Sequence, residues 1–131
     1  GSARPLDFGH WSAHKLESMT NYRLRHGEAV AIGIALDAKY SVLVGMLKKG
    51  MEERICCLLE YLGFNLWNAA IEKRNIHNGL VLIKGLKDFQ EHLGGQLTIT
   101  LLQEIGMGFE VNEIDISIVE ESIEWLKERQ K

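Results

Sequence analysis

The stretch LDFGHWSAHKLESMTNYRLRHGEAVAIG, from Leu6 to Gly33, carries three of the five histidines in this chain of 131 residues. The three are His10, His14 and His26, and an apolar run follows the last of them. Two histidines four residues apart lie one turn apart on a helix, so both imidazoles can reach a common point. Such pairs also arise by chance, and three interpretations stay open: a metal site, a catalytic acid–base set, or ordinary polar residues of a helical domain.

The composition is that of a single globular domain, with 46% hydrophobic and 25% charged residues and a net charge of -3. This charge gives no electrostatic reason to expect nucleic acid or a membrane surface as a partner. No segment reaches the roughly 18 apolar residues that span a bilayer. Cys56 and Cys57 are adjacent in an apolar helical stretch and poorly placed to pair, so we expect reduced core thiols in a cytoplasmic protein.

The spacing of apolar residues predicts a mainly α domain of several helices with a small β element. We expect helices over 11–19, 27–47, 51–62, 80–92 and 114–127, a short helix near 67–72, and a strand over 97–102 paired with 109–111. In the third helix the residues that should face inward are Ile55, Leu58, Leu59 and Leu62. Gly33 costs the second helix about 1 kcal/mol relative to alanine, which indicates close approach by another backbone.

The start of the helix predicted over 27–47 is compatible with more than one function. Exposed amides at a helix N-terminus favour an anion such as phosphate, and Gly27 leaves space beside the imidazole of His26. Glu28 complements the helix dipole and can also cap the helix. We expect His77 to be an ordinary solvated loop residue. A catalytic metal site usually needs three protein ligands, and the sequence holds neither HExxH nor CxxC, so the residues alone predict half a site.

Two segments resemble the C-terminal domain of the 3-dehydroquinate synthase family. They are FGHWSAHKLE from Phe8 and HGEAVAIG from His26, where the family has N-F-G-H-T-x-G-H-x-I-E and L-H-G-E-A-V-A-I-G. The segments 97–102 and 114–126 also resemble the family's late strand and closing helix. The resemblance implies that residues 1–131 form a helical C-terminal domain for metal and substrate, and that an N-terminal, NAD-binding Rossmann-like domain completes the intact protein.

The resemblance also implies residue roles. His10 and His26 would be ligands of a divalent metal, zinc or cobalt, with a third ligand, a glutamate, ahead of this domain. His14 would be catalytic and line the substrate pocket near the phosphate. In the family's reaction NAD transiently oxidises a secondary alcohol of a sugar phosphate whose oxygen the metal polarises. Phosphate is then eliminated, the ketone is reduced back, and an aldol step closes the ring.

The departures from the family pattern concern the phosphate side of the pocket. Asp7 replaces an asparagine, and Trp11 replaces a threonine. The family's pocket arginine falls on Ala3, with Arg4 one residue away, and His92 is the nearest stand-in for a phosphate-binding lysine. We expect Arg4, Asp7 and His92 to contact substrate together with the second motif histidine. A carboxylate beside a substrate phosphate would repel it, so these changes indicate a changed substrate. The stretch PLDFGHWSAH from Pro5 most resembles the sedoheptulose 7-phosphate cyclase branch, of the 2-epi-5-epi-valiolone synthase type.

Other interpretations remain. The chain could belong to 3-dehydroquinate synthase itself, or to the iron- or zinc-dependent alcohol and glycerol dehydrogenases, which have a comparable arrangement of histidines. It could also be a helical module without chemistry of its own. The expected partners are a sugar phosphate, the N-terminal NAD domain and a second copy of the protein, since family members often dimerise. We expect the isolated domain to bind zinc only weakly, because two imidazoles lack the third ligand.

Overall fold

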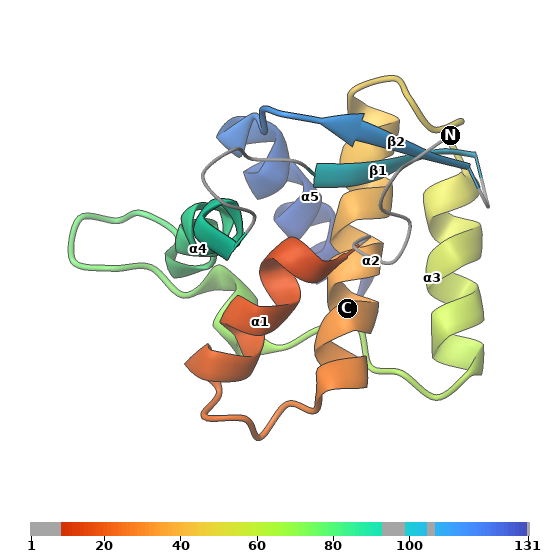
Figure 1. The fold of residues 1–131 in the computed structure, drawn as a ribbon. Helices are drawn as coiled ribbons and strands as arrows, with labels where there is room; N and C mark the ends of the chain where they lie inside the picture. Colours follow the sequence, from red (N-terminus) through yellow and green to blue (C-terminus); the bar gives the residue numbers. More distant parts are fainter. Residues whose placement is uncertain (1–8, 93–98, 105–106, 131) are drawn as a thin grey trace.

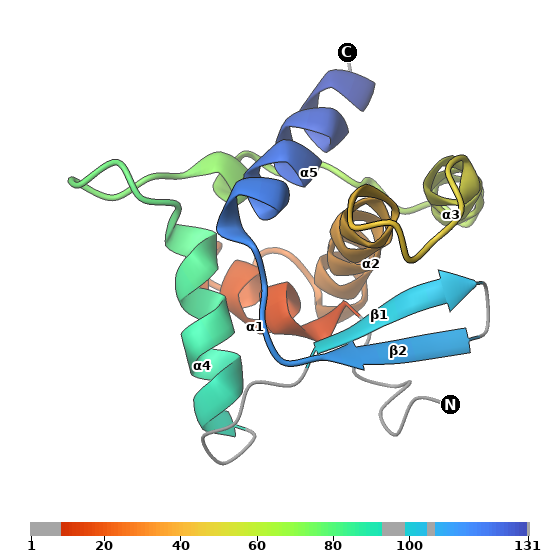
Figure 2. The ribbon, with the colours of Figure 1, turned by 90° about the horizontal axis from the view of Figure 1, so that it is seen from above.

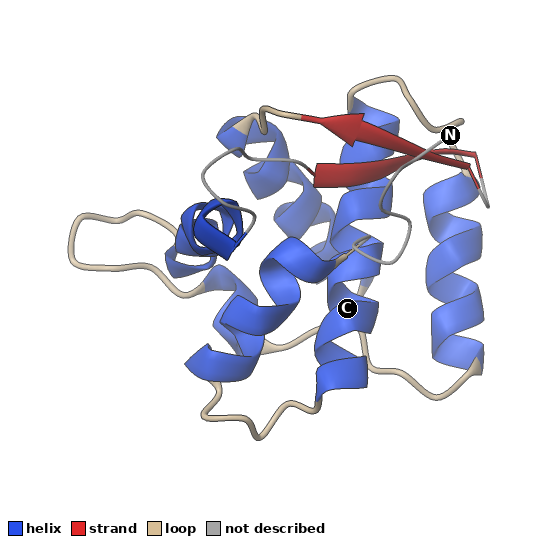
Figure 3. Ribbon diagram, in the orientation of Figure 1, coloured by secondary structure: helices blue, strands red, loops and turns tan. Residues whose placement is uncertain are grey.

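The computed structural model describes residues 9–92, 99–104 and 107–130, with the side chains of 9–88, 101 and 111–130. Helices make up most of this part of the chain, and a hairpin of two strands lies against them (Figure 3). In chain order the elements are α1 (His10–Met19), α2 (His26–Leu43), α3 (Met51–Tyr61), the 3₁₀ helices η2 (Ala69–Glu72) and η3 (Val81–Ile83), α4 (Lys84–His92), β1 (Ile99–Glu104), β2 (Met107–Val111) and α5 (Ile116–Arg129). The predicted class, mainly α with a small β element, is confirmed.

Helix α2 is the centre of the domain. It contacts α1, α3, α5 and β1, and the two ribbon views show these elements arranged around it (Figures 1 and 2). A helix surrounded in this way needs apolar residues on several faces, and Ile32, Leu36 and all four of its alanines are buried. The helix ends four residues earlier than predicted, at Leu43, because Gly45 takes a left-handed φ of 82°.

The predicted inward face of α3 is wrong in part. Leu58 and Leu62 are 59% and 61% exposed, whereas Glu52 and Cys56 are buried. The burial of Glu52 is explained by its partners, since its carboxylate accepts hydrogen bonds from Lys39 Nζ at 3.2 Å and from the Gly50 amide at 2.6 Å. These contacts turn a charged residue of α3 toward α2.

The two cysteines have different environments. Cys56 lies in the core, where burial raises the pKa of its thiol to about 12, but Cys57 is exposed. Both are free thiols. The expectation of two core thiols is therefore correct for Cys56 and wrong for Cys57.

The C-terminal half of the domain matches its predicted elements with shifted limits. The helix expected over 80–92 divides into η3 and α4, and the short helix near 67–72 is the 3₁₀ helix η2. The predicted pairing of the two strands is confirmed, and the structure adds that β1 and β2 run antiparallel with Leu101 opposite Phe109; residues 97 and 98 lie outside the described part. Asp115 caps α5 by accepting a hydrogen bond from the Ser117 amide. Among the described helices none has the length and apolar character that a bilayer crossing requires.

Candidate metal centre

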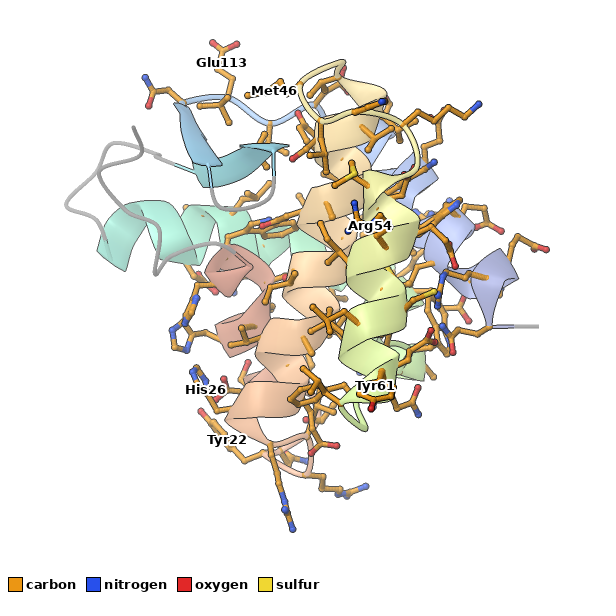
Figure 4. All side chains as sticks on the ribbon, turned by 90° about the vertical axis from the view of Figure 1, so that its right-hand side faces the viewer. Tyr22, His26, Met46, Arg54, Tyr61 and Glu113 are labelled. Carbon is orange, nitrogen blue, oxygen red and sulfur yellow. The ribbon has the colours of Figure 1, made fainter. Side chains whose placement is uncertain are left out.

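Three histidines that are distant in sequence gather at one place. His10 and His14 lie one turn apart on α1, and His26 is the first residue of α2. Their ring centroids are 5.6 Å apart for His10 and His26, 5.9 Å for His14 and His26, and 6.0 Å for His10 and His14. Figure 4 shows His26 on the side of α2 that faces α1, away from Tyr61 at the end of α3. The structure therefore brings together the three histidines that the sequence singled out.

The position of His10 depends on a close crossing of α1 and α2. Gly9 precedes α1 with a left-handed φ of 82°, which favours glycine. A Cβ atom added to Gly33 would collide with the carbonyl oxygen of Gly9 and would lie 2.9 Å from Ser12 Oγ. The close backbone approach predicted at Gly33 is confirmed, and it sets the first turn of α1 directly against α2.

A buried carboxylate fastens the same crossing. Asp37 of α2 is 2% exposed, and its two oxygens accept hydrogen bonds from Trp11 Nε1 at 2.7 Å and from the Gly9 amide at 3.1 Å. Burial raises the pKa of Asp37 to about 7, against the effect of these two hydrogen bonds. Because the donors come from the residues on either side of His10, Asp37 fixes the backbone that carries this imidazole.

Glu17 is the site residue to which the sequence assigned no role. Its Oε1 lies 2.6 Å from His26 Nδ1 and 3.9 Å from His14 Nδ1. Its position three residues after His14, and therefore on the same face of α1, was the available signal. Glu28, in contrast, has the capping role that was expected, because its Oε1 accepts a hydrogen bond from the Arg25 amide at 3.1 Å.

The donor atoms suit a transition metal of the zinc or cobalt type, for which imidazole and carboxylate are both common ligands. His14, Glu17 and His26 each offer a ligand atom, and these atoms lie within 4.8 Å of one another. Two donors bound to one tetrahedral zinc ion lie about 3.3 Å apart, which follows from metal–nitrogen distances near 2.0–2.1 Å. The donor types, and imidazoles that approach this spacing from two helices, therefore fit a divalent metal.

An open apolar hollow of about 300 Å³ adjoins the cluster. His10 and His26 form one wall of it, and the other walls are Gly27, Val30, Ala31, Ile34, Leu59 and Phe64. The imidazoles therefore stand at the rim of a depression between α2 and the end of α3. A bound molecule could reach both rings from this side.

The remaining predicted site residues cannot be placed beside the histidines. Arg4 and Asp7 lie outside the described residues. His92 ends α4, but its side chain is likewise outside the described part. His77 is an exposed loop residue, as expected, and its amide donates a hydrogen bond to Asn75 Oδ1 at 2.9 Å.

The fold thus places imidazoles from two crossing helices beside one hollow. Residues 1–85 match the family model described as 3-dehydroquinate synthase C-terminal. The chain belongs to this family. It is 35% identical over 113 residues to 3-dehydroquinate synthase of Clostridium perfringens strain 13, covering 86% of this chain and 31% of the relative. The enzyme of Caldanaerobacter subterraneus subsp. tengcongensis is 34% identical over 117 residues, covering 88% of this chain and 30% of the relative.

A solved structure supports the same fold. ValA, the 2-epi-5-epi-valiolone synthase of Streptomyces hygroscopicus subsp. jinggangensis 5008, superposes with a TM-score of 0.83 at 25% identity. The match covers 95% of this chain and 33% of ValA, whose structure has NAD+ and Zn2+ bound. The chain thus spans about a third of the length of the relatives it matches.

Proposed function

We propose that this chain is the metal- and substrate-binding C-terminal domain of a sugar phosphate cyclase, completed by an NAD-binding N-terminal domain. The observation that carries the proposal is the convergence of His10, His14 and His26, whose ring centroids are 5.6–6.0 Å apart, in a chain that belongs to the 3-dehydroquinate synthase family. The chain alone supplies only part of the active site. We therefore assign the activity to the intact protein.

In this proposal His10 and His26 hold the metal. Their rings form the closest of the three histidine pairs, at 5.6 Å, and both line the apolar hollow. The metal supplies a Lewis acid that polarises the substrate oxygen to be oxidised. His14 is 62% exposed and stands one turn further along α1, where it can reach the phosphate end of a substrate and move a proton there.

The proposed substrate is sedoheptulose 7-phosphate. Two observations support it: the likeness to a 2-epi-5-epi-valiolone synthase and the carboxylate of Asp7 where the family has an asparagine. A second candidate is 3-dehydroquinate formation, which is favoured by the 34–35% identity to two 3-dehydroquinate synthases. Assaying the intact protein with sedoheptulose 7-phosphate and with the precursor of 3-dehydroquinate distinguishes the two, with phosphate release as the readout.

The same assay separates a cyclase from a dehydrogenase. A cyclase returns its NAD to the oxidised form in each turnover, so phosphate release without net NADH is the expected result. Accumulation of NADH in proportion to substrate consumed, without phosphate release, would instead assign the protein to the alcohol dehydrogenase relatives.

The ligand assignment is tested by zinc titration of the intact protein. His10→Ala and His26→Ala should each weaken zinc binding strongly, whereas His14→Ala should leave it nearly unchanged. The last variant is the matched control, because all three substitutions remove one imidazole from the same cluster. Unchanged zinc affinity in both His10→Ala and His26→Ala would refute the assignment. If His14→Ala loses zinc affinity and His10→Ala keeps it, then His14 is the metal ligand of α1 and His10 is not.

A further inference from the structure

We propose that Glu17 is a positioning residue that selects which ring nitrogen of His26 is free to bind the metal. The inference rests on the proposed function, in which His26 is a ligand. Its basis is the distance of 2.6 Å between Glu17 Oε1 and His26 Nδ1, which is a short charge-assisted hydrogen bond.

The hydrogen bond determines where the imidazole proton lies. An ionised carboxylate can only accept a hydrogen bond, so the proton of the neutral ring must be on Nδ1. The lone pair is then on Nε2, which becomes the one ring nitrogen available to a cation. A ligating histidine held through its other nitrogen by a carboxylate is a common arrangement in metal sites.

The same distance argues against Glu17 and His26 Nδ1 as two ligands of one ion. Two donors on a tetrahedral zinc ion are about 3.3 Å apart, and 2.6 Å is too short for that separation. The contact is also selective, because His14 Nδ1 is 3.9 Å from the same oxygen and beyond hydrogen-bond range. Glu17 therefore acts on His26 rather than on His14.

His26 needs such a restraint because of where it stands. Its side chain is 56% exposed at the first position of α2, whereas the side chain of Glu17 is 13% exposed and held on α1. Glu17, the less exposed of the two side chains, therefore restrains His26. Without Glu17 the ring would have to select both its tautomer and its rotamer when the metal binds, and affinity would fall.

The first experiment needs no metal. Nitrogen-15 NMR of the histidine rings at about pH 8, where free imidazoles are neutral, reports the tautomer of each ring. In the 131-residue chain we expect His26 to carry its proton on Nδ1. Glu17→Ala should shift His26 toward the Nε2–H form that unrestrained histidine prefers, and Glu17→Gln, which keeps an acceptor oxygen, should largely preserve Nδ1–H. Glu120→Ala is the control, since Glu120 is an exposed glutamate that pairs with Arg74.

The second experiment is zinc titration of the same variants of the intact protein, because the isolated domain is expected to bind zinc only weakly. Glu17→Ala should weaken zinc binding about tenfold to a hundredfold, with a smaller loss for Glu17→Gln and none for Glu120→Ala. Persistence of the Nδ1–H tautomer in Glu17→Ala would overturn the proposal, as would wild-type zinc affinity in a Glu17→Ala protein whose His26→Ala counterpart has lost binding. If His26→Ala itself keeps full zinc affinity, the proposed ligand role fails, and the tautomer result still decides whether Glu17 orients the ring.

Discussion

The crossing of α1 and α2 and the histidine cluster beside it are neighbours with opposite physical character. The crossing, which consists of Gly9, Trp11, Gly33 and Asp37, is fully buried and closely packed. In the cluster, the side chains of His14 and His26 are more than half exposed. The comparison indicates that the crossing stabilises the fold and positions the histidines, whereas the cluster carries the side chains that would bind metal and substrate. Substitutions in the two regions should therefore have separable effects.

The largest effect is expected from Gly33→Ala. The new methyl group would collide with the Gly9 carbonyl, and backbone atoms cannot rotate away as a side chain can. We expect a loss of at least about 5 kcal/mol in the free energy of unfolding, or no folded protein, measured by urea denaturation followed by circular dichroism.

Gly27→Ala is the matched control for this substitution. Gly27 also lies in α2, but a Cβ there would meet only Phe64, at an ordinary 3.9 Å. This variant should keep its stability or gain up to about 1 kcal/mol from better helix propensity. Equal stability of Gly33→Ala and Gly27→Ala would show that the crossing is not a rigid contact.

The next effect is a pH dependence that originates at Asp37. Because its pKa is raised from 3.8 to about 7, the folded chain keeps a proton that the unfolded chain loses between these values. The stabilisation that comes from protonated Asp37 is therefore fully present below about pH 4. It decreases as the pH rises to about 7 and does not change further above that pH. The total decrease in the free energy of unfolding from this group is on the order of 4 kcal/mol.

Asp37→Asn tests this dependence, since an amide does not titrate. The measurement is the free energy of unfolding from pH 4 to pH 7 for both proteins, and the slope should be flatter in the variant. Parallel curves would show that Asp37 titrates normally. Asp115→Asn is the control, because hydrogen bonds from Ser117 lower the pKa of Asp115 and it titrates below this window.

A smaller loss is expected from Trp11→Phe. The substitution keeps most of the buried ring but removes the Nε1–H donor, which leaves Asp37 Oδ1 without that partner in the interior. We expect a loss of about 1–3 kcal/mol. Trp125→Phe, which keeps an aromatic face under Lys39 Nζ, should cost less than about 1 kcal/mol in the same denaturation assay.

The sequence predicted those features that depend on local spacing. The helical period indicated α1 and α2, Gly33 indicated close approach by a backbone that the sequence did not identify, and the histidine pair indicated one shared face. The partners of Asp37 and Glu17 could not be predicted in this way, because Asp37 meets Trp11 across 26 residues and Glu17 meets His26 across nine. The inward face of α3 was predicted incorrectly for the same reason, because a contact with Lys39 of α2, distant in sequence, holds Glu52 in the interior. The orientation of Asp37, Glu17 and Glu52 therefore depends on tertiary contacts rather than on local spacing.

The smallest effect on stability is expected from the cluster itself. His14→Ala removes an exposed ring and should change the free energy of unfolding by no more than about 0.5 kcal/mol, whereas His26→Ala also removes the hydrogen bond to Glu17 and should cost about 1 kcal/mol. Urea denaturation in the presence of a chelator measures this change without a metal contribution. A loss above about 1 kcal/mol in His14→Ala would mean that the cluster also stabilises the fold, and the separation between position and chemistry would no longer hold. If His26→Ala loses no more than about 1 kcal/mol, its fold is intact, and a loss of zinc affinity in this variant can be attributed to the missing ligand rather than to a disturbed α2.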